Sequence, residues 1–153
     1  MKPLFSICLF ALALTCSNLN ALEIKHVHYK EKTADDLTRI GEHFTGEARH
    51  PGRIVAQSQT DSREGLYFIL FLDSPLHTLP SDASATIEIL RDGQYKPETF
   101  TMELGDAPQR GRELYLGLTG SDWPVGSSKP TAWRVSIRSG SEEIAVRESF
   151  LWQ

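Results

Sequence analysis

Two histidines separated by one residue are the first side chains whose types and spacing could do chemistry. His26 and His28 fall in an alternating segment, residues 22–30, so in a β-strand both imidazoles project from one face, with Ile24 on the same face and Tyr29 on the other. Neutral imidazole is a good ligand for copper or zinc, but a site needs a third and usually a fourth ligand. No spacing ties the other histidines to this pair. The sequence favours two half-exposed histidines on an N-terminal edge strand, with a metal-binding accessory protein as the alternative.

The segment GSDWP, residues 120–124, is a second candidate. Its glycine permits an unusual backbone angle, Asp122 can cap local amides, and the proline fixes the exit of the turn. Trp123 would then lie at a loop tip, where an aromatic ring can stack on a sugar or anchor a partner. The alternative, which the sequence favours, is that Trp123 folds back and closes the end of the domain, because large exposed apolar surfaces are normally avoided.

A third candidate is the polar stretch EARHPG, residues 47–52, which contains Arg49 and His50. Rigid β-sandwiches carry recognition residues in their end loops. This stretch and the Trp123 loop therefore predict a non-enzymatic module that binds a protein or a cell-envelope component.

Arginines recur near the C-terminus and could form a cationic stripe that binds carboxylates or phosphates. Arg134 and Arg138 alternate along one expected strand, and Arg147 lies on its expected hairpin neighbour. Glutamates at 142, 143 and 148 are close enough to neutralise them. Cross-strand ion pairs on a solvated face are the favoured interpretation.

Catalytic and nucleic-acid signatures are missing from the sequence. It contains no GxSxG, HExxH, phosphate-loop or GxGxxG motif, so we expect no enzyme and no cofactor. The formal net charge is −4, with charges of both signs interspersed. Binding to nucleic acid needs a basic surface, and this composition argues against it.

The N-terminal residues have the build of a secretory signal peptide. A single charge at Lys2 precedes an apolar run over residues 4–14, and a small residue follows at Ala21. We expect cleavage after Ala21 and export to the periplasm or beyond, with both cysteines, Cys8 and Cys16, removed. The run is too short for a transmembrane helix, which needs about 20 apolar residues. A lipid anchor on Cys16 is disfavoured, because Leu14 and Thr15 stand where lipoprotein signals carry small residues.

The remainder, residues 22–153, predicts one all-β domain. Short apolar or alternating runs, separated by polar turns, recur about eight times after residue 21. They cover residues 22–30, 53–59, 66–72, 85–91, 99–104, 114–118, 133–138 and 144–152. This pattern favours an antiparallel sandwich of about seven to eight strands, immunoglobulin-like or fibronectin-like. In the last run, Glu148 interrupts the apolar phase of Val146 and Phe150, which predicts a bulge near Glu148 or an edge strand.

One short helix is expected near the start of the domain. Thr33 is a good N-cap, Asp36 stands three residues later, and apolar residues at 37, 40 and 44 recur at helical spacing before Gly46. Such a helix is too short to be stable alone, so its apolar stripe should pack on the β core.

Five segments together resemble an uncharacterised family of small exported bacterial proteins. They are RIGEHFTG at 39–46, GLYFILFLDSPLHTLP at 65–80, LYLGLTGSDWP at 114–124, AWRVSI at 132–137 and ESFLWQ at 148–153. The resemblance implies a single exported β-sandwich domain. It implies no activity, ligand or site residue.

Overall fold

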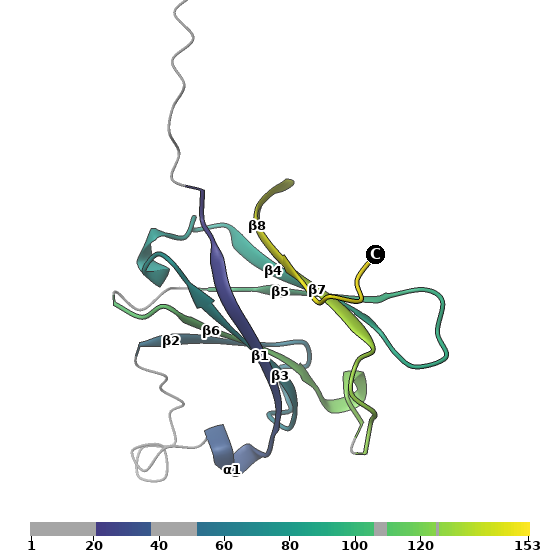
Figure 1. Ribbon diagram of the computed structural model, residues 1–153. Coiled ribbons are helices and arrows are strands. Elements are labelled where there is room, and N and C mark those ends of the chain that lie inside the picture. The colour runs from purple at the N-terminus through teal and green to yellow at the C-terminus, as the bar shows by residue number, and fades with distance from the viewer. Residues whose placement is uncertain (1–20, 38–51, 106–109, 125) are drawn as a thin grey trace, which may run out of the picture.

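Two four-stranded β-sheets make up the protein in its computed structural model, which describes residues 21–37, 52–105, 110–124 and 126–153 (Figure 1). The elements are β1 (Ile24–Lys32), α1 (Ala34–Leu37), β2 (Arg53–Gln57), β3 (Gly65–Leu72), η1 (Leu76–Thr78), β4 (Ala83–Leu90), β5 (Glu98–Glu103), β6 (Glu113–Thr119), η2 (Gly120–Asp122), β7 (Ala132–Ser139) and β8 (Glu142–Glu148). The prediction of an all-β sandwich is confirmed. Among the described residues, no helix is long and apolar enough to span a membrane.

The strand order is β1-β3-β6-β2 in sheet A and β5-β4-β7-β8 in sheet B. The pairs β4–β5 and β7–β8 are hairpins within sheet B, whereas β3 to β4, β5 to β6 and β6 to β7 cross between the sheets. The sandwich is antiparallel as predicted except at one pair, where β2 runs parallel to β6. Three strands separate β2 from β6 along the chain, so no tight turn forces them to run in opposite directions.

The core lies between the sheets and is filled by alternate residues of the central strands. Leu66, Phe68 and Leu70 of β3 face it, and Ile87 of β4 and Ile137 of β7 meet them from the other sheet. The alternation predicted for β4, β5 and β7 places the correct residues inside. Within each strand, successive side chains face the core and the outer surface in turn, because the side-chain period of a strand is two residues.

A bulge in β1 changes which residues face the core. Ile24 pairs with Leu72, but His26 pairs with Phe71, so Lys25 is an extra residue in the strand. Ile24 is buried, whereas both histidines are exposed and Tyr29 packs against the core. His26 and His28 share a face as predicted, but Ile24 does not share it with them.

A second bulge lies in β8, the edge strand of sheet B. Ile137 pairs with Ala145 and Arg138 with Glu143, so the extra residue is Ile144 and the bulge is not at Glu148. The edge position is as predicted, since an edge strand tolerates a bulge without breaking a second ladder. The bulge turns Ala145 inward and leaves Val146 exposed.

The last strand is also shorter than the predicted 144–152. It ends at Glu148, and the following residues form a turn in which the Trp152 N–H donates to the Ser149 carbonyl. Phe150 therefore does not continue the strand, and its side chain is exposed.

The outer face of sheet A carries a small second cluster of apolar side chains. Tyr67 of β3 is fully buried there beside Tyr115, and Leu37 of α1 packs on both. The Tyr67 ring lies against Gly117, where any Cβ would meet it at 2.6 Å. Its hydroxyl donates to the Arg63 carbonyl, and burial raises the pKa of Tyr67.

The predicted helix begins as expected. The Asp36 carboxylate accepts hydrogen bonds from the Thr33 N–H at 2.8 Å and from its hydroxyl at 3.1 Å, and these bonds lower the pKa of Asp36. Leu37 is buried as its position in the stripe predicts. The rest of the expected helix, up to Gly46, lies outside the described residues.

Gly65→Ala tests the close approach of β3 to β6. A Cβ at position 65 would lie 1.9 Å from the Leu118 carbonyl oxygen, a backbone atom that cannot move alone. We expect a loss of about 3 kcal/mol in the free energy of unfolding, measured by urea denaturation. Gly93→Ala is the matched control: it has a φ of +76° and open space around it, and should cost only about 1 kcal/mol. Equal losses in the two variants would contradict the steric explanation.

Candidate functional site

The Trp123 loop is held by the backbone before and after it. Gly120 has a φ of +57° and begins η2, and the Trp123 N–H closes this turn on the Gly120 carbonyl at 3.1 Å. Gly120 thus supplies the unusual backbone angle that the sequence predicts. The Asp122 carboxylate accepts a hydrogen bond from the Gln59 amide at 3.0 Å, so it fixes the loop against the segment after β2.

Trp123 itself closes the end of the sandwich. Its side chain is 4% exposed and belongs to the main core cluster. The indole N–H donates to the Glu31 carboxylate at 3.2 Å, and the Arg91 guanidinium lies 4.7 Å from the ring centroid. The interpretation that the sequence favoured, closure of the domain end, is therefore the one that the structure shows. Trp123 therefore does not form an exposed recognition tip.

Trp123 nevertheless forms one wall of a pocket of about 240 Å³. The other walls come from the end of β1, the start of β3 and the segment after η2. The lining residues are Glu31, Lys32, Thr33, Glu64, Gly65, Trp123 and Gly126. Typical small-molecule sites measure about 300–1,000 Å³, so this pocket suits one side chain or one ring.

Two carboxylates and one ammonium group line the pocket. Glu31 follows the inward phase of β1, and Glu64 is exposed beside the start of β3. Among the described residues, neither carboxylate forms an ion pair. Lys32 also lines the pocket, and its ammonium lies 5.7 Å from the Tyr115 ring centroid. The exposed carboxylates of Glu31 and Glu64 thus line the pocket beside the indole, together with one lysine.

Sequence reasoning missed Glu31 and Glu64, which lie far from Trp123 along the chain. One signal for Glu31 was available, because it shares the phase of Val27 and Tyr29 in β1, which both pack on the core. A carboxylate that follows apolar side chains on the same face of a strand indicates that a hydrogen-bond donor lies near the end of that strand. Nothing in the local sequence marks Glu64.

The remaining predicted site residues do not join this pocket. His26 and His28 lie on the outer face of sheet A, and the His28 ring meets the edge of Phe71 with centroids 5.9 Å apart. In the described part of the chain, no group of three or more His, Cys, Asp or Glu residues could hold a metal ion. Arg49 and His50 lie outside the described residues.

A larger hollow of about 680 Å³ lies at the other end of the sandwich, near the start of β1. Pro75, Leu79 and Ile144 give it apolar walls, and Glu143 lies on its rim. No aromatic side chain lines it, and the Glu143 carboxylate is already bonded to Arg134. It therefore differs from the Trp123 pocket in having no aromatic wall.

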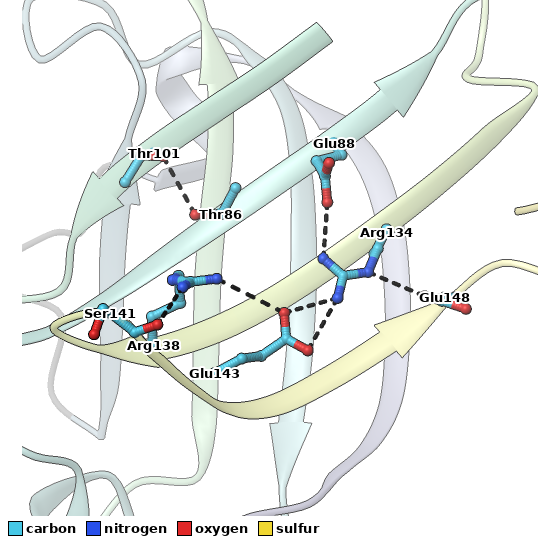
Figure 2. A network of polar contacts seen from close by, with 8 residues as sticks. All are labelled: Thr86, Glu88, Thr101, Arg134, Arg138, Ser141, Glu143 and Glu148. Carbon is cyan, nitrogen blue, oxygen red and sulfur yellow. Dashed lines mark hydrogen bonds and ion pairs between the residues drawn. The ribbon is translucent and has the colours of Figure 1, made fainter. Parts of the chain in front are cut away.

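Of the three arginines of the predicted stripe, Arg134 is neutralised by glutamates on both neighbouring strands, whereas Arg147 lies in register with the buried Val135. Figure 2 shows Arg134 at the centre of three carboxylates on the outer face of sheet B. Its guanidinium donates to Glu88 of β4 at 2.9 Å, and to Glu143 and Glu148 of β8 at 2.7 and 3.0 Å. These hydrogen bonds, led by the one to Glu88, raise the pKa of Arg134. The favoured interpretation, ion pairing across strands, is confirmed for this residue.

The chain matches no protein-family model, and no curated protein or solved structure is similar to it. The two-sheet architecture thus rests on the structure itself. Its immunoglobulin-like or fibronectin-like type, and the resemblance to an exported bacterial family, stay predictions.

Arg134→Gln should destabilise the fold, because three carboxylates on adjacent strands would lose their shared cation. The Arg134 side chain is 23% exposed, so we expect a loss of about 2 kcal/mol in the free energy of unfolding. Arg138→Gln is the matched control on the same strand, since its nearest carboxylate, Glu143, is 3.9 Å away. It should cost less than about 1 kcal/mol. Urea denaturation that gives similar values for both would show that the network adds nothing to a surface ion pair.

Proposed function

We propose that the protein is a non-enzymatic, exported binding module that takes a lysine or arginine side chain of a protein partner into the Trp123 pocket. The observation that carries the proposal is the pair of carboxylates, Glu31 and Glu64, that lines a pocket walled by a tryptophan. A cationic side chain has an apolar stem and a charged tip, and this combination of walls is complementary to both. The pocket volume of about 240 Å³ is sufficient for one such side chain.

Rigid walls make this pocket a suitable binding site. The Trp123 indole N–H bonds to Glu31 and Arg91 lies over the ring, so the ring needs no reordering when a ligand enters. Preorganised groups avoid the entropy cost of fixing side chains on binding, which is about 0.5–1.5 kcal/mol for each side chain. A single side chain should still bind weakly alone, with a Kd of about 1 mM, and a partner would add contacts around the rim.

Export is part of the proposal and is supported by the charge and apolar run of residues 1–21. In this interpretation the domain acts in the periplasm or outside the cell. Its partner is a protein there, and an amino-bearing component of the cell envelope is the alternative occupant.

N-acetyllysine amide and N-acetylarginine amide test the pocket directly. In a titration followed by nuclear magnetic resonance, the indole N–H signal of Trp123 should shift, because that N–H already bonds to Glu31 at the pocket wall. The indole signals of Trp133 and Trp152 serve as internal controls. Neutral N-acetylglutamine amide should leave all three unchanged, and a response to glucosamine alone would favour the envelope component.

The matched variants are Glu64→Gln and Glu103→Gln. Glu64 lines the pocket, whereas Glu103 is exposed on β5, away from it. Loss of one exposed carboxylate should weaken binding about twofold to fivefold for Glu64→Gln and leave it unchanged for Glu103→Gln. If neither cationic compound moves the Trp123 signal at tens of millimolar, the pocket does not bind such side chains.

Metal binding by His26 and His28 is a second candidate, because both imidazoles are exposed on the same face of β1. A titration with zinc or copper should then release heat and raise the melting temperature, and either His26→Ala or His28→Ala should abolish both effects. His77→Ala, at an exposed histidine of η1, is the control. Titrations without heat or a thermal shift would end this alternative.

A further inference from the structure

The largest exposed apolar side chains of the described residues gather at one end of sheet B. Tyr95 is 99% exposed, Phe150 is 93% exposed and Leu151 is 61% exposed. Tyr95 lies in the loop that joins β4 to β5, and the other two lie in the turn after β8. We call these three residues, with the loops that carry them, the exposed aromatic end.

The register of the sheet places these loops at the same end. Ile89, near the end of β4, pairs with Glu98 at the start of β5, and Arg134 near the start of β7 pairs with Glu148 at the end of β8. Figure 1 agrees, because the long loop between β4 and β5 and the C-terminal turn lie on the same side of the molecule. Two separate loops therefore carry exposed side chains at the same end of sheet B.

Both loops are anchored at their bases. The Arg91 guanidinium bonds to Glu98 at 2.9 Å across the base of the first loop, and the Gln94 N–H closes a turn on the Arg91 carbonyl. After β8, the Ser149 N–H donates to the Trp133 carbonyl at 2.9 Å, and the Trp133 N–H donates back to the Ser149 hydroxyl. The apolar side chains are thus exposed by a fixed backbone, at a cost that a soluble domain normally avoids.

Two lysines lie at the exposed aromatic end, although the whole chain has a formal charge of −4. Lys96 follows Tyr95, and Lys129 lies in the segment whose Thr131 N–H bonds to Leu90 at the end of β4. Both lysines are exposed, and among the described residues neither forms an ion pair. The acids Glu98 and Glu148, by contrast, are bonded to Arg91 and Arg134. Asp92 is the remaining exposed acid of the first loop.

We propose that the exposed aromatic end docks on an anionic lipid surface. Tyrosine, phenylalanine and leucine insert at the boundary between headgroups and acyl chains, and lysines beside them are attracted to anionic headgroups. Apolar side chains alone would fit another protein or a second copy of the chain equally well. Lys96 and Lys129, which form no ion pair within the described part of the chain, favour the lipid surface. This inference does not depend on the Trp123 pocket, because none of its residues lines that pocket.

Sedimentation with lipid vesicles tests the proposal. The protein, without residues 1–21, is mixed with vesicles of phosphatidylcholine alone or with about one third phosphatidylglycerol. We expect binding to the second kind only, and a strong decrease at about 1 M salt, where the Debye length falls to about 3 Å. The double variant Lys96→Gln/Lys129→Gln should weaken binding about 25-fold, since each lysine near an anionic surface contributes about fivefold.

Tyr95→Ser/Phe150→Ser should weaken binding at least about tenfold, because it removes the inserted rings. These side chains are exposed, so circular dichroism should show an unchanged fold. Val146→Ser is the matched control: its side chain is 43% exposed, but it lies on the face of β8 and not at the end. Equal loss in the Val146 variant, or no binding to anionic vesicles, would overturn the proposal. A concentration-dependent dimer in sedimentation velocity, without vesicle binding, would assign this end to a second copy.

Discussion

A single guanidinium joins the two sheets at the end of the molecule where both proposed surfaces lie. Arg91 stands just after β4 in sheet B, bonds to Glu98 of β5, and places its charge over the Trp123 ring. It also donates to the Asp122 carbonyl at 2.8 Å, so it holds the backbone of the turn that carries the tryptophan. Trp123 in turn donates to Glu31 of β1. A continuous chain of polar and ring contacts therefore runs from the edge strand of sheet B to the edge strand of sheet A.

This chain of contacts explains why a tryptophan in a loop is buried. A ring of this size left in water would expose a large apolar surface, and folding it over the core end removes that cost. Once buried, the indole N–H can no longer donate a hydrogen bond to water, and the Glu31 carboxylate accepts that bond instead. The guanidinium on the ring contributes about 0.5–2 kcal/mol more and is itself neutralised by Glu98. The same arrangement leaves Glu64 at the pocket with no ion pair among the described residues, and the proposed binding of a cationic side chain rests on this carboxylate.

The sequence predicted those features that depend on regular alternation or on neighbours along the chain. The inward phases of β4, β5 and β7 follow from a period of two, and the ion pairing of Arg134 follows from a hairpin that brings Glu148 beside it. The cap formed by Thr33 and Asp36 is equally local. Each of these needs only a strand, a turn or a helix start to be recognised.

The failures have a common physical origin in single-residue insertions and long-range pairing. The extra residues Lys25 and Ile144 reverse the phase of their strands, and no residue type marks either position. The parallel pairing of β2 with β6 joins segments about 60 residues apart in the sequence. At that separation, the hydrophobic pattern of the two strands does not indicate whether they run parallel or antiparallel. The pocket was missed for the same reason, since Glu31, Glu64 and Trp123 meet only after both sheets have formed.

The two proposed surfaces carry opposite charge and are linked through Arg91. The pocket presents Glu31 and Glu64, whereas the exposed aromatic end presents Lys96 and Lys129. Arg91 bonds to Glu98 at the base of the β4–β5 loop and lies over the Trp123 ring, so it contacts both the pocket wall and the loop that carries Tyr95. A domain docked by this end on an anionic membrane would hold its acidic pocket near the lipid. Basic side chains gather beside anionic membranes, because the surface potential attracts them. If both proposals hold, the expected partner is a basic segment close to a membrane, which the lipid would concentrate and the pocket would bind.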